Sequence, residues 1–210
     1  MSQPYDRRNR HHRFRQVWKR PSARDARRRL LKPGARLVPR ALELLARPLL
    51  LPEAEFRQRA FGRTAVKRWR DLYGMDFRPL LDVASKDPVY SIAEGEVVAA
   101  WPPAGPPAVL ASVDLTTFEA ASVRAVTDVV VDPPGLVNAV AVTFRARLHD
   151  GIAHTLDPWR WPSSSWATSV WTLPEPVDVG PGSALRASYC RRIAGKPDGL
   201  TVEVVGCGAG

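Results

Sequence analysis

Residues 122–148, SVRAVTDVVVDPPGLVNAVAVTFRARL, contain the pattern that decides the fold. Two runs rich in valine, Ser122 to Val131 and Leu136 to Leu148, stand on either side of Asp132-Pro133-Pro134-Gly135. β-Branched residues favour extended backbone, and consecutive prolines followed by glycine interrupt it. The sequence therefore predicts two β-strands joined by a tight connection.

Similar runs, rich in Val, Thr and aromatic residues, continue on both sides of this stretch. Turn residues separate them, among them Pro102-Pro103 and Pro106-Pro107. Many short strands at this spacing are typical of a barrel or a sandwich. The other predicted strands are Ala41 to Ala46, Glu96 to Ala100, Val109 to Asp114, Trp166 to Leu173, Ala184 to Arg191 and Leu200 to Val205.

Two segments have helical composition. Ser22 to Leu31 offers an N-cap and a short basic helix, which Pro33-Gly34 would end. Glu53 to Trp69 has apolar residues at helical spacing and ends before Tyr73-Gly74, where the β-character begins. We therefore predict a mainly β protein, an antiparallel β-barrel with a short N-terminal helix and a helical insertion.

Positive charge is concentrated at the start of the chain. Residues 1–36 contain thirteen Lys or Arg and two acids, a net charge of +11, whereas residues 37–210 have a net charge of −1. Residues 1–24 have too little apolar content to fold alone, which predicts a disordered basic tail. The alternative is an arm that neutralises nucleic-acid phosphates. Its contacts would be Arg7, Arg8, Arg10, Arg13 and Arg15.

Localisation and metal binding are constrained by what the sequence lacks. No run approaches the roughly 20 apolar residues that a membrane helix needs, and the basic N-terminus has no signal-peptide core. Cys190 and Cys207 are too few for a disulfide framework and have no histidine at ligand spacing. We expect a cytoplasmic protein with reduced thiols, no metal and no contact with a membrane.

The order of several short motifs resembles the C-terminal β-barrel portion of the protein arginine methyltransferase family. The similarity spans residues 25–205. Its motifs are Asp25 to Pro39 with Lys32-Pro33-Gly34, Trp69 to Asp76, Val113-Asp114-Leu115-Thr116, Leu136 to Leu148 around Phe144, and Trp161 to Trp171 followed by Leu173 to Pro176 and Gly180.

The resemblance implies a domain organisation. Residues 25–40 would be a remnant of the last helix and strand of a Rossmann-type domain. Residues 41–210 would form the β-barrel domain, and its insertion at about 53–76 would correspond to the family's dimerisation arm.

The same resemblance identifies parts that this sequence lacks. The family binds S-adenosylmethionine at a glycine-rich turn that precedes the barrel, and it holds the target arginine with two glutamates. Upstream of Asp25 the only acid is Asp6. We therefore expect this chain to bind no cofactor and to have no catalytic residues of its own, although S-adenosylmethionine is implied for a complete enzyme.

The family's threonine-histidine-tryptophan positions fall on Ser164, Ser165 and Trp166, which are the substrate-binding candidates. Serine cannot replace the proton chemistry of an imidazole. Trp166 could wall a substrate pocket or belong to the core. The neighbouring tryptophans could likewise form a partner surface or close one end of the barrel, and we expect the nearby histidines to lie on the surface. These residues are Trp159, Trp161, Trp171, His149 and His154.

Two glycine clusters resemble cofactor-binding turns. We interpret Gly180-Pro181-Gly182 as a hairpin connection. Val202 to Gly210 is similar to the first motif of a methyl-donor site, but the family places that motif before the barrel. We therefore interpret it as a chance likeness.

Two function classes follow. The first is a methyltransferase-like protein that is catalytically incomplete alone, as a barrel subunit for a separately encoded S-adenosylmethionine-binding domain or as a truncated remnant. The second is a non-enzymatic binding module with a nucleic-acid-binding arm and a barrel that forms a homodimer.

Overall fold

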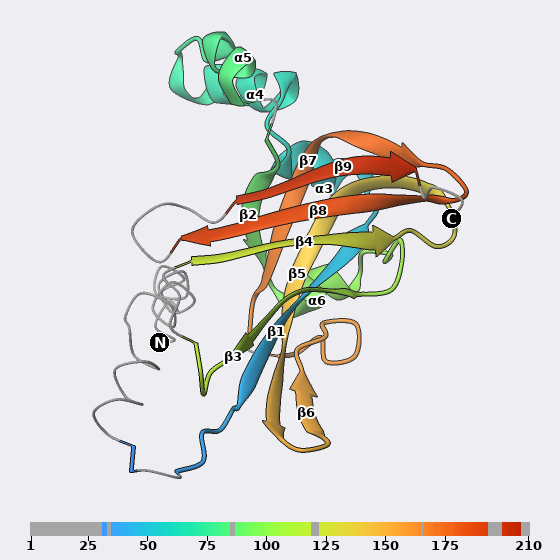
Figure 1. Cartoon of the computed structure of the whole chain (residues 1–210). Coiled ribbons are helices and arrows are strands. Elements are labelled where there is room, and N and C mark those ends of the chain that lie inside the picture. Colours follow the sequence, from blue (N-terminus) through green and yellow to red (C-terminus); the bar gives the residue numbers. More distant parts are fainter. Residues whose placement is uncertain are drawn as a thin grey trace.

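The computed structural model describes residues 31–32, 35–84, 87–118, 122–164, 166–192 and 199–206. The fold is mainly β, as predicted (Figure 1). Its elements are β1 (Ala41–Leu49), α3 (Glu53–Arg59), α4 (Arg63–Tyr73), the short 3-10 helix η2 (Arg78–Leu80), α5 (Leu81–Ala84), β2 (Val89–Ala93), α6 (Gly95–Ala99), β3 (Ala108–Asp114), β4 (Ser122–Val130), β5 (Gly135–His149), β6 (Ile152–Thr155), β7 (Thr168–Val179), β8 (Ser183–Arg192) and β9 (Gly199–Gly206).

The strands form two antiparallel sheets. The larger sheet has the order β2-β7-β5-β1-β3, with β6 paired to β5, and the smaller sheet has the order β4-β8-β9. Figure 1 shows β4, β8 and β9 running side by side in front of the larger sheet. Within the described residues, main-chain pairing does not close the two sheets into a barrel. The predicted strand chemistry is therefore confirmed, whereas the closed barrel is replaced by two facing sheets.

β5 is the longest strand and the centre of the larger sheet. Its residues 139–147 pair with β1, its first half pairs with β7, and its last residues pair with β6. Val140 and Val142 point into the core between the two sheets, whereas Ala139 and Ala141 point into a second cluster on the opposite face. Both faces are covered, which explains why this part of the sequence reads as a continuous apolar run.

The main core lies between the sheets. Side chains from seven strands of the two sheets meet there, and Trp171 of β7 packs edge-on against Tyr189 of β8 with ring centroids 6.4 Å apart. Alternate residues of a strand point to opposite faces, so every second residue of the valine-rich strands faces this core. The connection at Asp132 to Gly135, which is tight as predicted, carries the chain from β4 in the smaller sheet to β5 in the larger sheet.

The outer face of the larger sheet is covered by α6 and the segment that follows it. Val98 and Trp101 pack there against Leu49 and Val170. The prediction of a strand at Glu96 to Ala100 is wrong, because these residues belong to α6 and its C-terminal end. A short apolar run does not distinguish a strand from a buried helical turn.

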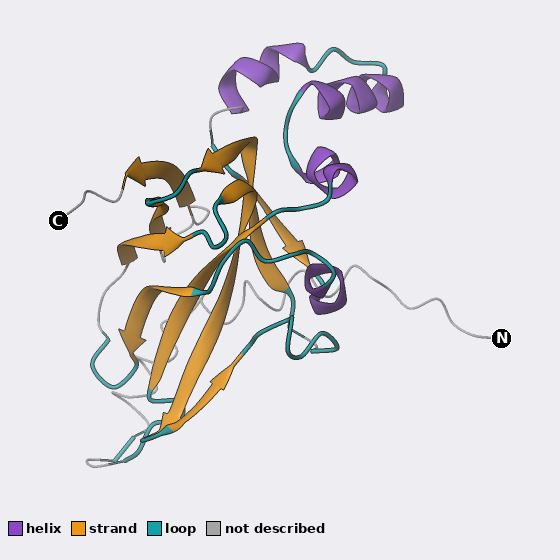
Figure 2. Cartoon of the chain, turned by 90° about the vertical axis from the view of Figure 1, so that its right-hand side faces the viewer, coloured by secondary structure: helices purple, strands orange, loops and turns teal. Residues whose placement is uncertain are grey.

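The helical insertion is made of separate helices. The segment of helical composition from Glu53 to Trp69 is helical as predicted, but the backbone is extended at Ala60 and Gly62, which separates α3 from α4. α4 continues to Tyr73 and ends at Gly74, whose φ of 68° is a left-handed conformation that favours glycine. The helices lie to one side of the strands in Figure 2, and α4 and α5 project away from the sheets in Figure 1.

Aromatic contacts and a charged turn hold the projecting helices together. Trp69 contacts Phe61 and Phe77, with ring centroids 5.4 and 5.5 Å away. After α4, Asp76 accepts hydrogen bonds from the side chain and the backbone N–H of Arg78, which lower the pKa of Asp76 to about 2. The ionised carboxylate therefore stabilises this turn throughout the neutral range.

Seven of the predicted strands are present with shifted ends, and two strands were missed. β7 begins at Thr168, not Trp166, and continues through two prolines to Val179. β2 and β6, of five and four residues, were not predicted because so short a run carries little periodicity.

The predicted N-terminal helix up to residue 30 and half of the 25–40 segment lie outside the described residues, and residues 31–32 and 35–40 contain no helix or strand. In the part of the chain that the structure describes, none of the helices has the length and apolar character needed to cross a membrane.

Candidate functional site

The resemblance-based site residues lie in the segment that leads into β7. The backbone N–H of Trp166 donates to the Ser164 hydroxyl at 3.3 Å, so Ser164 shapes the turn. Trp166 is 44% exposed, and its ring stands edge-on to Phe144 of β5, with centroids 5.4 Å apart. Ser165 lies outside the described residues. The structure thus places Trp166 against the strand that carries the family-like phenylalanine.

Trp166 borders an apolar cavity of about 360 Å³ at one side of the space between the sheets. Aromatic side chains form much of its wall, and the polar groups in it are few. The described lining residues are Pro39, Leu42, Leu44, Val113, Val123, Val142, Thr143, Phe144, Ala146, Leu156, Trp166, Ala167, Ser169, Trp171, Tyr189 and Arg191. A cavity of this kind suits an apolar surface or ligand.

The chemistry of this Trp166 cavity does not match the charge of a target arginine. A guanidinium is held by carboxylates, ideally as a bidentate pair. None of the described residues lining the cavity is an acid, and its one charged side chain, Arg191, would repel a guanidinium. The cavity can therefore supply a wall for a substrate but not the charges that hold it.

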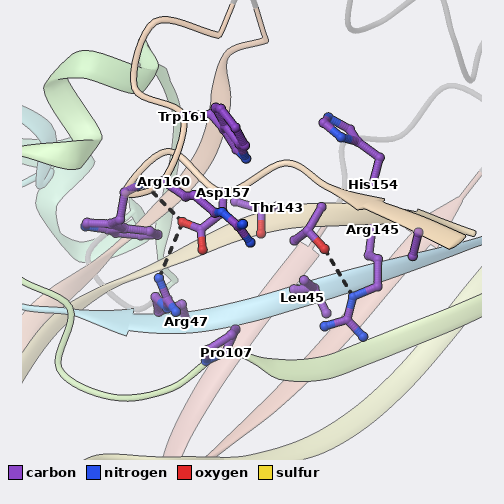
Figure 3. A pocket seen from close by; sticks show the side chains of 12 residues that line it. Leu45, Arg47, Pro107, Thr143, Arg145, His154, Asp157, Arg160 and Trp161 are labelled. Atoms are coloured by element: carbon purple, nitrogen blue, oxygen red, sulfur yellow. Dashed lines mark hydrogen bonds and ion pairs between the residues drawn. The ribbon is translucent and has the colours of Figure 1, made fainter. Parts of the chain in front are cut away.

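A second hollow, the polar pocket, lies on the outer face of the larger sheet and has a volume of about 390 Å³ (Figure 3). Sequence reasoning did not identify it. It is lined by side chains of β1, β5 and β6, by Pro107 before β3, and by the turn that follows β6: Leu45, Arg47, Pro107, Thr143, Arg145, Ala153, His154, Thr155, Asp157, Trp159, Arg160 and Trp161.

Arg47 is the most enclosed cation of the polar pocket. Its guanidinium lies 4.6 Å from the Trp159 ring centroid and 3.6 Å from the Asp157 carboxylate. Trp159 is fixed in turn, because its indole N–H donates to the Trp101 carbonyl at 2.9 Å. A partly buried network of ring, acid and backbone therefore positions the Arg47 side chain.

Glu43 forms the second charged group of this face. Its side chain is only 5% exposed and pairs with Arg145 at 3.1 Å and with Arg147. Glu43 and Arg145 are directly opposite in the β1–β5 ladder, and Arg147 is two residues further along the same face. One buried carboxylate thus lies between two guanidinium groups, which compensates its burial.

A third hollow of about 580 Å³ adjoins the polar pocket and shares Arg145 with it. Asp114 lines it and accepts hydrogen bonds from the hydroxyl and the backbone N–H of Thr116, at 2.5 and 2.8 Å. These bonds, with the charge of Arg40, lower the pKa of Asp114. Asp114 therefore remains ionised at neutral pH and stabilises the turn after β3.

The remaining tryptophans and histidines divide between core and surface. Trp171 is 3% exposed and belongs to the main core, whereas Trp161 is 52% exposed at the rim of the polar pocket. His149 and His154 are exposed, as expected. Cys190 is a free thiol, and the described residues contain no group of three or more His, Cys, Asp or Glu side chains that could hold a metal.

The glycine cluster at Gly180 to Gly182 forms a turn, in which Ser183 N–H donates to the Gly180 carbonyl at 3.1 Å. It joins β7 to β8, which belong to different sheets, so the expected hairpin is instead a crossing between sheets. The glycines at 208 and 210, and the arginines of the nucleic-acid hypothesis, lie outside the described residues.

No family model matches the sequence, and no curated protein matches it. Solved structures match the fold. A chain of the Trypanosoma brucei PRMT1 enzyme–prozyme heterotetrameric complex with AdoHcy has a TM-score of 0.60 and 13% identity, covering 90% of this chain and 67% of that chain. Protein arginine methyltransferase 10 of Arabidopsis thaliana has a TM-score of 0.52 and 15% identity, covering 90% and 65%. This chain thus spans about two thirds of their length, and it shares the fold of the C-terminal β-rich part of protein arginine methyltransferases.

Proposed function

We propose that this chain is a protein arginine methyltransferase-like protein that is catalytically incomplete alone and acts as a substrate-side subunit. The single observation that supports this most is the Trp166 cavity, which offers an apolar aromatic wall without an acidic residue among its described lining. A methyl-accepting arginine needs carboxylates and a bound S-adenosylmethionine, so a second domain would provide both.

The partner in this proposal is a separately encoded Rossmann-type domain that docks at the Trp166 cavity. Residues 41–210 would be the β-domain, and residues 25–40 would form the junction with the partner. The T. brucei neighbour is a chain of an enzyme–prozyme heterotetrameric complex, which is a precedent for a chain of this fold that works in a complex with a different chain. We place the complex in the cytoplasm.

Isothermal titration of the purified chain with S-adenosylmethionine should give no saturable heat. Co-expression with a Rossmann-type domain that ends in a paired-glutamate loop, encoded elsewhere in the same genome, should give a complex that binds one S-adenosylmethionine. In that complex, Trp166→Glu should weaken the association at least about tenfold, because it places a charge where the partner would bury an exposed aromatic side chain.

A matched control for that experiment is Tyr90→Glu, which adds the same charge at a 47% exposed aromatic residue that does not line the cavity. One-to-one micromolar binding of S-adenosylmethionine by the chain alone would contradict the proposal. Equal effects of the two substitutions would contradict docking at the cavity.

A second candidate function is self-association through the projecting helices. Leu72, Tyr73 and Met75 are 68, 65 and 57% exposed, and Leu80 of η2 is 44% exposed. Apolar side chains gathered on a projecting segment are typical of an interface. In this proposal two copies of the chain associate through these four side chains, at the end of α4 and in the segment that follows it, and the β-sheets serve as a dimeric platform.

Light scattering after size exclusion tests the self-association. The chain should elute as a dimer, and Leu72→Glu should convert it to a monomer by placing a charge in the apolar contact. Thr64→Glu, an exposed position on the first turn of α4, should leave the dimer intact. A monomer at all concentrations, or a dimer that survives Leu72→Glu, would refute this assignment.

A further inference from the structure

The polar pocket has the features of an anion site. Three guanidinium groups line it, from Arg47, Arg145 and Arg160, together with His154 and one acid, Asp157. Asp157 pairs with Arg47, and nearby Glu43 is shared between Arg145 and Arg147. The lining therefore retains an excess of positive charge after its own acids are counted, which favours an anionic ligand.

Arg47 is not fully satisfied by its protein neighbours. Its side chain is 16% exposed, its contact with Asp157 is long at 3.6 Å, and its buried Nε has no hydrogen-bond acceptor in the described part of the chain. A guanidinium has five N–H donors, and leaving such groups unpaired in a buried position is unfavourable. An oxyanion in the pocket would accept from the terminal N–H groups of Arg47, whose contact with Asp157 is long.

An aromatic wall adjoins the cations. Trp161 stands at the rim, half exposed, and its backbone N–H is fixed by the Asp157 carbonyl at 2.8 Å. Figure 3 shows Trp161 and His154 above the strands that carry Arg47 and Arg145. A flat ring stacks on an indole regardless of its hydrogen-bonding edge. The volume of about 390 Å³ falls within the range of small-molecule sites.

We propose that the polar pocket binds a nucleotide, with its phosphate at Arg47, Arg145 and Arg160 and its base against Trp161. The ligand class follows from the combination of cations with an exposed aromatic ring, since either feature alone would suit a different molecule. The site lies on the outer face of the larger sheet, and Thr143 is the one described residue that lines both it and the Trp166 cavity.

The proposal is tested by titrating the full chain with adenosine monophosphate, with inorganic phosphate and with adenosine. Tryptophan fluorescence reports the binding of each. Adenosine monophosphate should bind at least about tenfold more tightly than either fragment, because it uses both the cations and the ring. Binding should weaken as salt is raised.

Two exposed residues provide variants that leave the fold intact. Arg160→Gln should weaken binding of adenosine monophosphate and of phosphate alike, by about fivefold. Trp161→Leu should weaken the binding of adenosine monophosphate by about tenfold and leave the binding of phosphate unchanged. Arg70→Gln, which removes an exposed guanidinium on α4, is the matched control and should have no effect.

The proposal is overturned if adenosine monophosphate shows no saturable binding, if phosphate alone binds as tightly, or if Trp161→Leu has no effect. S-Adenosylmethionine has an adenosyl group without phosphate and should not compete. The outcome is therefore distinguishable from that of the methyltransferase proposal, which depends on the Trp166 cavity and a partner domain.

Discussion

Replacing Asn138 with alanine is expected to reduce the free energy of unfolding by about 2 to 5 kcal/mol. Asn138 is 2% exposed, and its side chain accepts from the Leu51 N–H at 2.7 Å and donates to the Leu51 carbonyl at 2.9 Å. Alanine would leave both backbone groups buried without partners. Urea denaturation followed by circular dichroism would measure the change.

Asn138→Asp sharpens this test, because the carboxylate keeps the acceptor for Leu51 N–H but loses the donor and adds a buried charge. It should also be strongly destabilising. Asp150→Ala removes one exposed ion pair with Arg40 and should change the free energy of unfolding by less than about 0.5 kcal/mol. An Asn138→Ala variant as stable as this control would show that Leu51 does not depend on the amide.

The second large effect is expected for Gly105→Ala, at about 3 kcal/mol or more of lost stability. A Cβ at Gly105 would lie 2.2 Å from the Val130 carbonyl oxygen and 3.2 Å from Pro48 Cγ. The Val130 carbonyl oxygen is a backbone atom, so it cannot relieve the clash by a change of rotamer as a flexible side chain could. β4 would have to move away from the end of β1, and thermal denaturation would report the loss.

Gly135→Ala is the matched control for Gly105→Ala. Nothing lies within 4 Å of a Cβ at Gly135, which begins β5. The control should be neutral or slightly stabilising, since alanine restricts the unfolded chain. Equal melting temperatures for the two variants would mean that the sheets are not held as closely at Gly105 as the structure places them.

Strands with a strong local signal were predictable from the sequence. β3, β8 and β9 were predicted within about two residues at each end because apolar and polar residues tend to alternate along them in the sequence. α6 was mistaken for a strand because its five residues make little more than one helical turn. Its helical state depends on tertiary contacts, including the approach of Gly95 to Pro162, where an added Cβ would lie 2.5 Å from the carbonyl oxygen.

The two hollows differed in how far the sequence could predict them. Trp166 was found because a family-like motif marks it. The polar pocket was missed because Arg47, Arg145 and Asp157 come from three segments, with about 100 residues between the first and the second. A local pattern cannot show that such residues meet. The alternation of Arg145 and Arg147 around the buried Ala146 is visible in the sequence, but such alternation is typical of a charged strand face, not of a pocket.

The lack of a continuous ladder between the sheets in the described residues has a consequence for motion. Strand pairs separate only when the hydrogen bonds of their ladder break, whereas these facing sheets are joined by side-chain packing and by hydrogen bonds at their margin, from Thr127 to the Val109 carbonyl and from Asp132 N–H to the Ala104 carbonyl. β4, β8 and β9 can therefore shift as a unit against β5 while every ladder bond within each sheet is kept. Such a breathing motion would widen the space beside Trp166 and let an apolar anchor of a second protein enter.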